Sequence, residues 1–130
     1  MRSKLAMLIV VCAAALMLGA CGSDSQESSE GSSSTSLKTF AGAWGEEASG
    51  QPSLTIAEDG SFNGTDGCNS LVGHGTVDQK KFDFGNFATT LMACQDVDTW
   101  LSGANTATVD GDTLTVFNHA GDKIGTLEKR

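Results

Sequence analysis

Turn sequences recur at short intervals from Leu37 to the end of the chain and leave little room for long helices. Four of them, at 58–60, 78–80, 110–112 and 118–122, are polar and contain Asp, Asn or Gly. The 13 glycines in these 94 residues suit so many tight reversals. Antiparallel hairpins joined in this way need no crossover helices, so a parallel doubly wound sheet is disfavoured.

The segments between the turns alternate apolar and polar side chains, which is the period of a strand with one buried face. The predicted strands are 54–56, 61–63, 71–77, 81–84, 108–109, 113–117 and 123–127. Their inner faces would carry an apolar set that predicts one small core, namely Phe62, Phe82, Phe84, Leu114 and Val116.

One segment has helical spacing instead. Val97, Trp100, Leu101 and Ala104 lie at positions i, i+3, i+4 and i+7, and Asp96 is suited to cap the N-terminus of a helix that presents them. We therefore predict an α+β fold with a single small domain. Its antiparallel sheet of about eight strands would form a partly open barrel curled around this one helix.

The N-terminus has the features of a bacterial lipoprotein signal peptide. Residues 1–4 form a short basic segment that contains Arg2 and Lys4, and the uncharged apolar run at 5–18 is shorter than the roughly 20 residues that a membrane-spanning helix needs. The run ends in LGAC at 18–21, which is typical of a lipobox that is cut before a lipid-bearing cysteine. We predict a signal peptide at 1–20 and a lipidated Cys21. The mature protein would then be anchored to the cell membrane or envelope and face the extracytoplasmic side.

The next segment is purely polar. Residues 22–36 contain eight serines and three acidic residues, so we predict a disordered tether at 21–36 and a folded domain at 37–130. Without the signal peptide, six basic residues stand against sixteen acidic ones, a net charge near −10. We therefore expect no binding to nucleic acid, and attachment to the membrane through the acyl chains on Cys21 alone.

Two cysteines remain as thiols after this processing. Cys12 leaves with the signal peptide and Cys21 carries lipid, so Cys68 and Cys94 are expected to form one disulfide in an oxidising compartment. Two separate buried thiols are the alternative if that compartment is reducing.

A different class of alternative is an envelope enzyme that uses Cys68 as its nucleophile and His74 as the base. A disulfide to Cys94 would remove the thiolate that such a reaction needs, so we expect no enzymatic activity. The chain has no cofactor motif. Its two histidines, His74 and His119, have no ligand-spaced partners, so we predict neither a cofactor nor a metal site.

A series of short motifs runs through the predicted domain: GAW at 42–44, GTDGCN at 64–69, Gly73, FG at 84–85, TTLMAC at 89–94 and VDGDTLTV at 109–116. Together they resemble the META domain (HslJ-like) family of bacterial envelope proteins, although Leu71 stands where the family usually has an aromatic residue. The resemblance implies an antiparallel sheet curled around one helix and an exported or lipid-anchored protein. It implies no established enzymatic activity. Members of the family have been linked to heat shock, drug tolerance, motility and virulence, without an agreed molecular mechanism.

We therefore expect a non-catalytic protein that binds a protein partner or a small apolar ligand in envelope stress or a surface function. Trp44, Phe40 and Phe62 are candidate ligand-facing residues, with core packing as the alternative because so small a domain needs its aromatic residues. A ligand would lie between the helix and the concave face of the sheet. Gly67 and Asn69 form a turn motif, in which Asn69 is expected to bond the local backbone.

Overall fold

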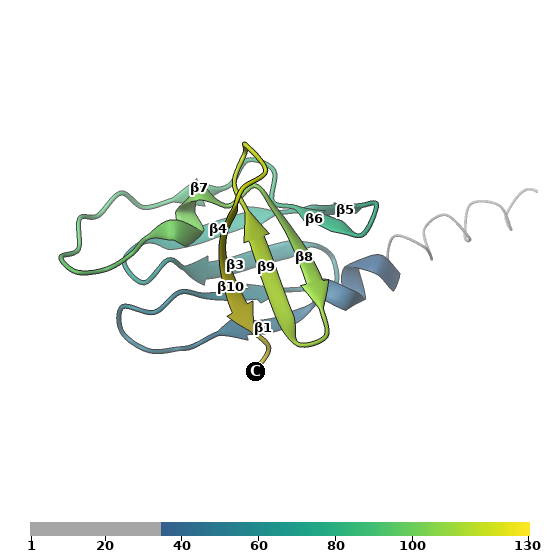
Figure 1. Cartoon of the computed structure of the whole chain (residues 1–130), viewed down its shortest axis with the longest axis horizontal. Helices are drawn as coiled ribbons and strands as arrows, with labels where there is room; N and C mark the ends of the chain where they lie inside the picture. The colour runs from purple at the N-terminus through teal and green to yellow at the C-terminus, as the bar shows by residue number, and fades with distance from the viewer. Residues whose placement is uncertain (1–34) are drawn as a thin grey trace, which may run out of the picture.

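The computed structural model describes residues 35–130, and the predicted signal peptide, Cys21 and the tether up to residue 34 lie outside the described residues. A helical stretch at 35–40, across the predicted boundary at 37, leads into ten short strands within this part of the chain. The strands are β1 (Gly42–Gly45), β2 (Ser53–Ile56), β3 (Ser61–Thr65), β4 (Ser70–His74), β5 (Thr76–Asp78), β6 (Lys81–Asp83), β7 (Ala88–Thr89), β8 (Thr106–Asp110), β9 (Thr113–Phe117) and β10 (Lys123–Glu128). A single 3-10 turn, η1 (Trp100–Gly103), lies between β7 and β8 (Figure 1).

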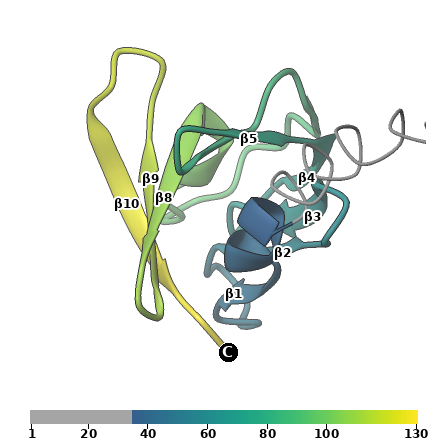
Figure 2. The ribbon, with the colours of Figure 1, turned by 90° about the vertical axis from the view of Figure 1, so that its right-hand side faces the viewer.

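The strands form two five-stranded antiparallel sheets that face each other (Figure 2). One has the order β1-β2-β3-β4-β7 and the other β10-β9-β8-β6-β5. Along one side, the backbone N–H of Arg130 donates to the carbonyl of Ala43 at 2.9 Å. On the other side, the chain passes from β4 directly into β5. The antiparallel arrangement is as predicted, whereas the single curled sheet is wrong.

The division into two sheets occurs at Gly75, inside the segment predicted as one continuous strand. A side chain at this position would place its Cβ 2.3 Å from the ring of Phe82 and 2.6 Å from the carbonyl oxygen of Asp83. Glycine therefore lets the chain change sheets in close contact with the buried ring, where any larger residue would clash.

The predicted hairpins are confirmed where the turn residues determine them locally. In the turn between β2 and β3, the Asp59 carboxylate accepts hydrogen bonds from the Ser61 hydroxyl at 2.6 Å and the Ser61 N–H at 2.8 Å. These bonds lower the pKa of Asp59 below its ordinary value. Between β5 and β6, Gln79 and Lys80 both adopt positive φ angles, which match the twist of a tight hairpin.

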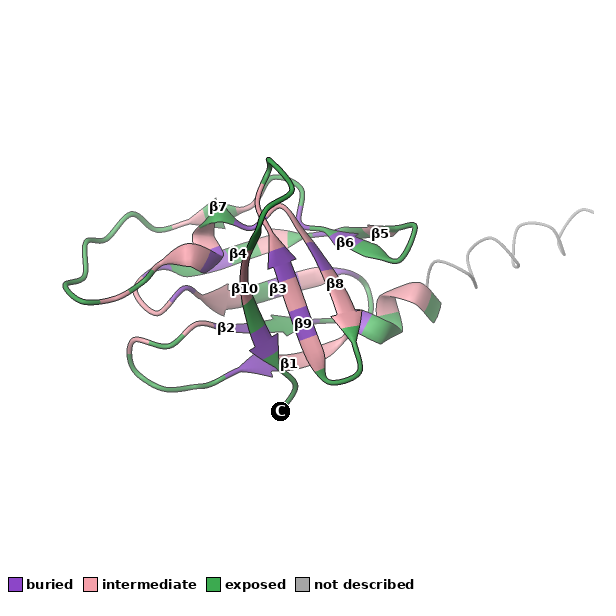
Figure 3. Cartoon of the chain, in the orientation of Figure 1, coloured by how far each residue is buried: buried purple, intermediate pink, exposed green. Residues whose placement is uncertain are grey.

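The core lies between the two sheets. Figure 3 shows that strands of both sheets carry buried residues. The strands alternate as expected, so that Leu54 and Ile56 of β2 and Leu114 and Val116 of β9 point inward. The buried apolar residues are Phe40, Trp44, Leu54, Ile56, Phe62, Leu71, Phe82, Phe84, Leu101, Ala104, Ala107, Leu114, Val116 and Leu127. Three of the rings, those of Phe62, Phe82 and Phe84, pack edge to face with centroids 5.0–6.0 Å apart.

The predicted amphipathic α-helix is wrong. Only Trp100–Gly103 is helical, Asp96 has a φ of 59°, and Thr99 precedes the turn without a capping side-chain bond. The preceding residues are held elsewhere, because Cys94 is bonded to Cys68 and Val97 packs against the β3–β4 turn. Leu101 enters the core, whereas Trp100 stays half-buried, close above Gly125. The sheets therefore pack on each other rather than around a helix.

Candidate functional site

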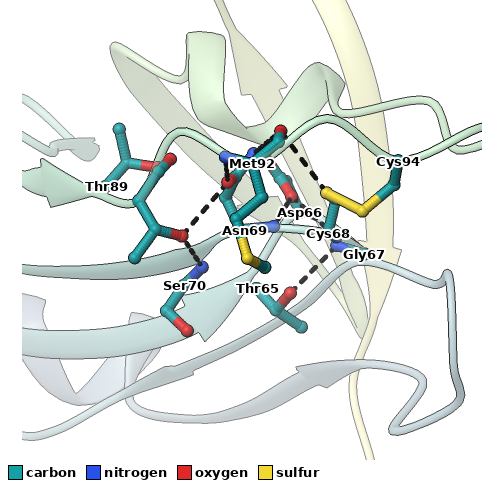
Figure 4. The surroundings of a disulfide bond; sticks show 10 residues. Thr65, Asp66, Gly67, Cys68, Asn69, Ser70, Thr89, Met92 and Cys94 are labelled. Atoms are coloured by element: carbon teal, nitrogen blue, oxygen red, sulfur yellow. Dashed lines mark hydrogen bonds between the residues drawn. A yellow bond between two sulfur atoms is a disulfide. The ribbon is translucent and has the colours of Figure 1, made fainter.

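The turn between β3 and β4 is built around a buried carboxylate. The Asp66 side chain has no solvent exposure, and its Oδ1 accepts hydrogen bonds from the backbone N–H groups of Cys68 and Asn69 (Figure 4). The Asp66 N–H in turn donates to the carbonyl of Asn69 at 3.1 Å. These bonds close a compact turn whose polar groups are satisfied internally.

Gly67 occupies the position in this turn that tolerates no side chain. Its φ is +100°, and a Cβ would lie 2.7 Å from the carbonyl oxygen of Gly50 and 3.0 Å from Cγ1 of Val97. Both the backbone conformation and the close approach of these two segments therefore require glycine.

Cys68 and Cys94 form a disulfide, with Cα atoms 5.9 Å apart. The predicted pairing is confirmed, and the alternative of two separate thiols is not what the structure shows. The bond ties the β3–β4 turn to the chain that follows β7 (Figure 4).

Asn69 makes a second tie to the same stretch of chain. Its Oδ1 accepts from the Met92 N–H at 2.6 Å and from the Thr90 hydroxyl at 3.1 Å. Its Nδ2 donates to the Met92 carbonyl and to Oδ2 of Asp66, each at 3.4 Å. Three of these four bonds therefore reach residues more than twenty positions away, and the fourth reaches the Asp66 side chain. None goes to the local backbone that the turn sequence suggests.

The stretch held in this way, which we call the 90–94 segment, runs without a helical turn or bend from Thr90 to Cys94. The Thr90 N–H donates to the carbonyl of Ser70 at 3.1 Å, and the Ser70 N–H donates to the Thr90 hydroxyl at 3.0 Å. Between these fixed points, Leu91 is 93% exposed and Met92 is 60% exposed. In Figure 1 the loop that continues from this segment projects from one end of the molecule.

Leu91 and Met92 are not predicted as site residues by the sequence patterns, which treat large apolar side chains as core. One signal was present, because the two apolar residues are adjacent and fit neither the alternation of a strand nor the spacing of a helix. Asp66 likewise gives no local sign that it is fully buried.

Replacing Asp66 by asparagine is expected to lower the free energy of unfolding by about 1–3 kcal/mol. The substitution keeps an acceptor for the two backbone N–H groups but replaces Oδ2 by an amide NH2 group that faces the Asn69 Nδ2 donor. Urea denaturation measures the effect. Asp112→Asn, in an exposed turn, should leave the midpoint unchanged, and equal effects of the two substitutions would contradict the role of the buried carboxylate.

The three candidate ligand-facing residues lie in the core. Trp44, Phe40 and Phe62 are at most 4% exposed, and the Trp44 indole N–H donates to the carbonyl of Phe40 at 2.8 Å. A groove of about 290 Å³ borders Phe40 beside Val77 and Val109, which pack against the edge of the core. These three residues therefore pack in the core, and a ligand between the helix and the sheet stays a prediction.

Neither a reactive thiol nor a set of metal ligands is found among the described residues around the β3–β4 turn. The Cys68 sulfur is bonded to Cys94 and is no thiolate in this structure. Within residues 35–130, no three His, Cys, Asp or Glu side chains gather closely enough to hold a metal ion.

Comparison with known proteins places these features in a family. No curated protein and no solved structure that we compared with the chain matches it significantly. The META domain family, in contrast, matches residues 31–130, which include both sheets, the β3–β4 turn and the 90–94 segment. The match covers most of the 130 residues, and the chain therefore belongs to the META domain family.

Proposed function

We propose that this protein is a non-catalytic, lipid-anchored envelope protein that binds a protein partner through the 90–94 segment. The observation that carries the proposal is the exposure of Leu91 and Met92, at 93% and 60%, on a backbone that is fixed on both sides.

A single exposed leucine is ordinary on a protein surface, but two large apolar residues on an immobilised backbone are not. Binding usually costs free energy because segments and side chains become ordered. Here Asn69 and the disulfide already hold the backbone of Met92 and Cys94 in place. Leu91 and Met92 can therefore act as anchors that enter apolar pockets of a partner at reduced entropic cost.

The charge around the 90–94 segment indicates which charge the partner's surface should carry. No Lys or Arg occurs between Lys81 and Lys123, and the exposed Asp96 and Asp98 closely follow the segment. A complementary surface would carry apolar pockets with basic side chains at their rim. The filled interior favours such a protein partner over a small apolar ligand.

The absence of catalysis and the extracytoplasmic location are supported by the same disulfide. An enzyme that used Cys68 would need a free thiolate, whereas this sulfur is bonded to Cys94. Disulfides persist mainly in exported proteins, so the bond agrees with the export that the predicted signal peptide implies. Among the helices of residues 35–130, none has the length and apolar character to cross a bilayer.

Photo-crosslinking in bacterial cells tests the proposed surface. A benzophenone amino acid at position 91 should give a discrete protein adduct in the envelope fraction or the medium. The same residue at position 119, in the exposed turn between β9 and β10, is the matched control and should give none. Identical adducts at both positions, or none at position 91, would refute partner binding through this segment.

Anchoring is tested by Cys21→Ser, since the hydroxyl of serine cannot replace the thiol that accepts the lipid. The variant should stay as an uncleaved precursor and incorporate no radiolabelled fatty acid, whereas Cys12→Ser should be processed normally. Normal acylation of the Cys21→Ser protein would remove the lipid anchor from the proposal.

A further inference from the structure

We infer that the 90–94 segment is a substrate-like loop that inhibits serine endopeptidases with an apolar S1 pocket, with Leu91 entering that pocket. The inference rests on the proposed partner-binding surface and names the class of partner. It follows from three properties of the segment: the shape of the backbone, its free hydrogen-bonding groups and the ties on either side of one peptide bond.

The backbone of the segment has no helix, turn or bend that would keep it out of an endopeptidase cleft. From Thr90 to Cys94 the chain has no helical turn or bend, and its most exposed side chain, Leu91, projects from the middle. Within the described part of the chain, neither the N–H nor the carbonyl of Leu91 has a hydrogen-bond partner. Both groups can therefore pair with the main chain of an enzyme, as an added strand does.

Both sides of the Leu91–Met92 bond are tied to the same stretch of the domain, residues 68–71. On the N-terminal side, Thr89 pairs with Leu71 and Thr90 is bonded to Ser70 through two hydrogen bonds. On the C-terminal side, the N–H and carbonyl of Met92 bond Asn69, and Cys94 is joined to Cys68. Cleavage of this one bond would leave both new ends attached close to each other.

These ties favour reversal of the enzyme's first chemical step. The serine hydroxyl of the enzyme adds to the Leu91 carbonyl carbon, the bond to the Met92 nitrogen breaks, and the enzyme's histidine passes the serine proton to that nitrogen. The Met92 amine cannot diffuse away, because Asn69 and the disulfide hold it beside the acyl group. It attacks the acyl-enzyme, re-forms the peptide bond and returns a proton to the serine oxygen. A held nucleophile has a high effective concentration and outcompetes water.

The identity of Leu91 sets the expected specificity. An S1 pocket with an apolar slot accepts leucine, whereas a pocket with an aspartate at its base requires Lys or Arg. Chymotrypsin and trypsin provide these two pockets as probes.

The test uses the full chain purified in detergent and titrated against both enzymes. Chymotrypsin should be inhibited at one-to-one stoichiometry, and trypsin should retain its activity. Leu91→Arg should weaken inhibition of chymotrypsin by at least about 100-fold and create inhibition of trypsin. Because the Leu91 side chain is 93% exposed, the substitution should leave the stability of the fold unchanged. Val72→Arg, at an exposed apolar position of β4, is the matched control and should change neither titration.

A second readout separates inhibition from ordinary cleavage. In mass spectrometry, chymotrypsin should convert the intact chain to a stable mixture of intact chain and chain cut only at the Leu91–Met92 bond. Starting from the cut chain, the enzyme should re-form intact chain. Asn69 is a positioning residue in this scheme, so Asn69→Ala should increase the yield of cut chain about tenfold or more.

Two outcomes would overturn the inference: rapid complete cleavage without inhibition, or no inhibition of chymotrypsin at any ratio. If either occurs while the position-91 crosslink persists, partner binding stands and only the protease class is wrong. If neither the position-91 crosslink nor inhibition of chymotrypsin is observed, both the proposed partner binding and the protease inference are wrong.

Discussion

Replacing Cys68 and Cys94 together by serine is expected to lower the free energy of unfolding by about 3.5 kcal/mol. The disulfide closes a loop with a sequence separation of 26, and its loss returns that conformational freedom to the unfolded chain. For a domain of this size the change corresponds to a fall in Tm of about 15–25 °C, measurable by circular dichroism. This loss of free energy is a large share of the total stability of a small domain.

Reduction of the unaltered protein provides the control for this prediction. Dithiothreitol should lower the Tm of the native chain by a similar amount and leave that of the double serine variant unchanged. A loss below about 1 kcal/mol would mean that the hydrogen bonds of Asp66 and Asn69 hold the turn without the covalent bond.

Phe82→Ala is expected to cost about 3–5 kcal/mol, the range for truncating a buried aromatic side chain. Phe82 is fully buried, and its ring packs against those of Phe40, Phe62 and Phe84. It also covers Gly75, where the chain passes between the sheets. The cavity left by alanine would therefore loosen the junction of the two sheets as well as the core.

Phe82→Leu is the matched variant, because it keeps most of the apolar volume and should cost less than about 1.5 kcal/mol. Urea denaturation of the two variants measures the difference. If alanine and leucine proved equally tolerated, the aromatic cluster would contribute little and the sheets would be held by their backbone contacts.

The sequence by itself determined the features that depend on neighbouring residues. The hairpin around Asp59 and Gly60 was predictable because the turn residues bond and bend locally while the flanking residues alternate at a period of two. The pairing of Cys68 with Cys94 was predictable for a different reason, since counting the cysteines left one pair. The family resemblance, confirmed by the META domain match over residues 31–130, also implied the antiparallel architecture.

Only the tertiary structure decided the features that depend on distant contacts. The apolar spacing at 97–104 predicted an α-helix, but the disulfide at Cys94 and the packing of Val97 restrict the chain to one 3-10 turn. Asn69 finds its partners at Thr90 and Met92 because folding brings the 90–94 segment beside its turn. Leu91 is 93% exposed between Thr90 and Met92, which are bonded to Ser70 and Asn69. Local patterns describe which bonds a residue can make, whereas the folded chain decides which groups lie within reach.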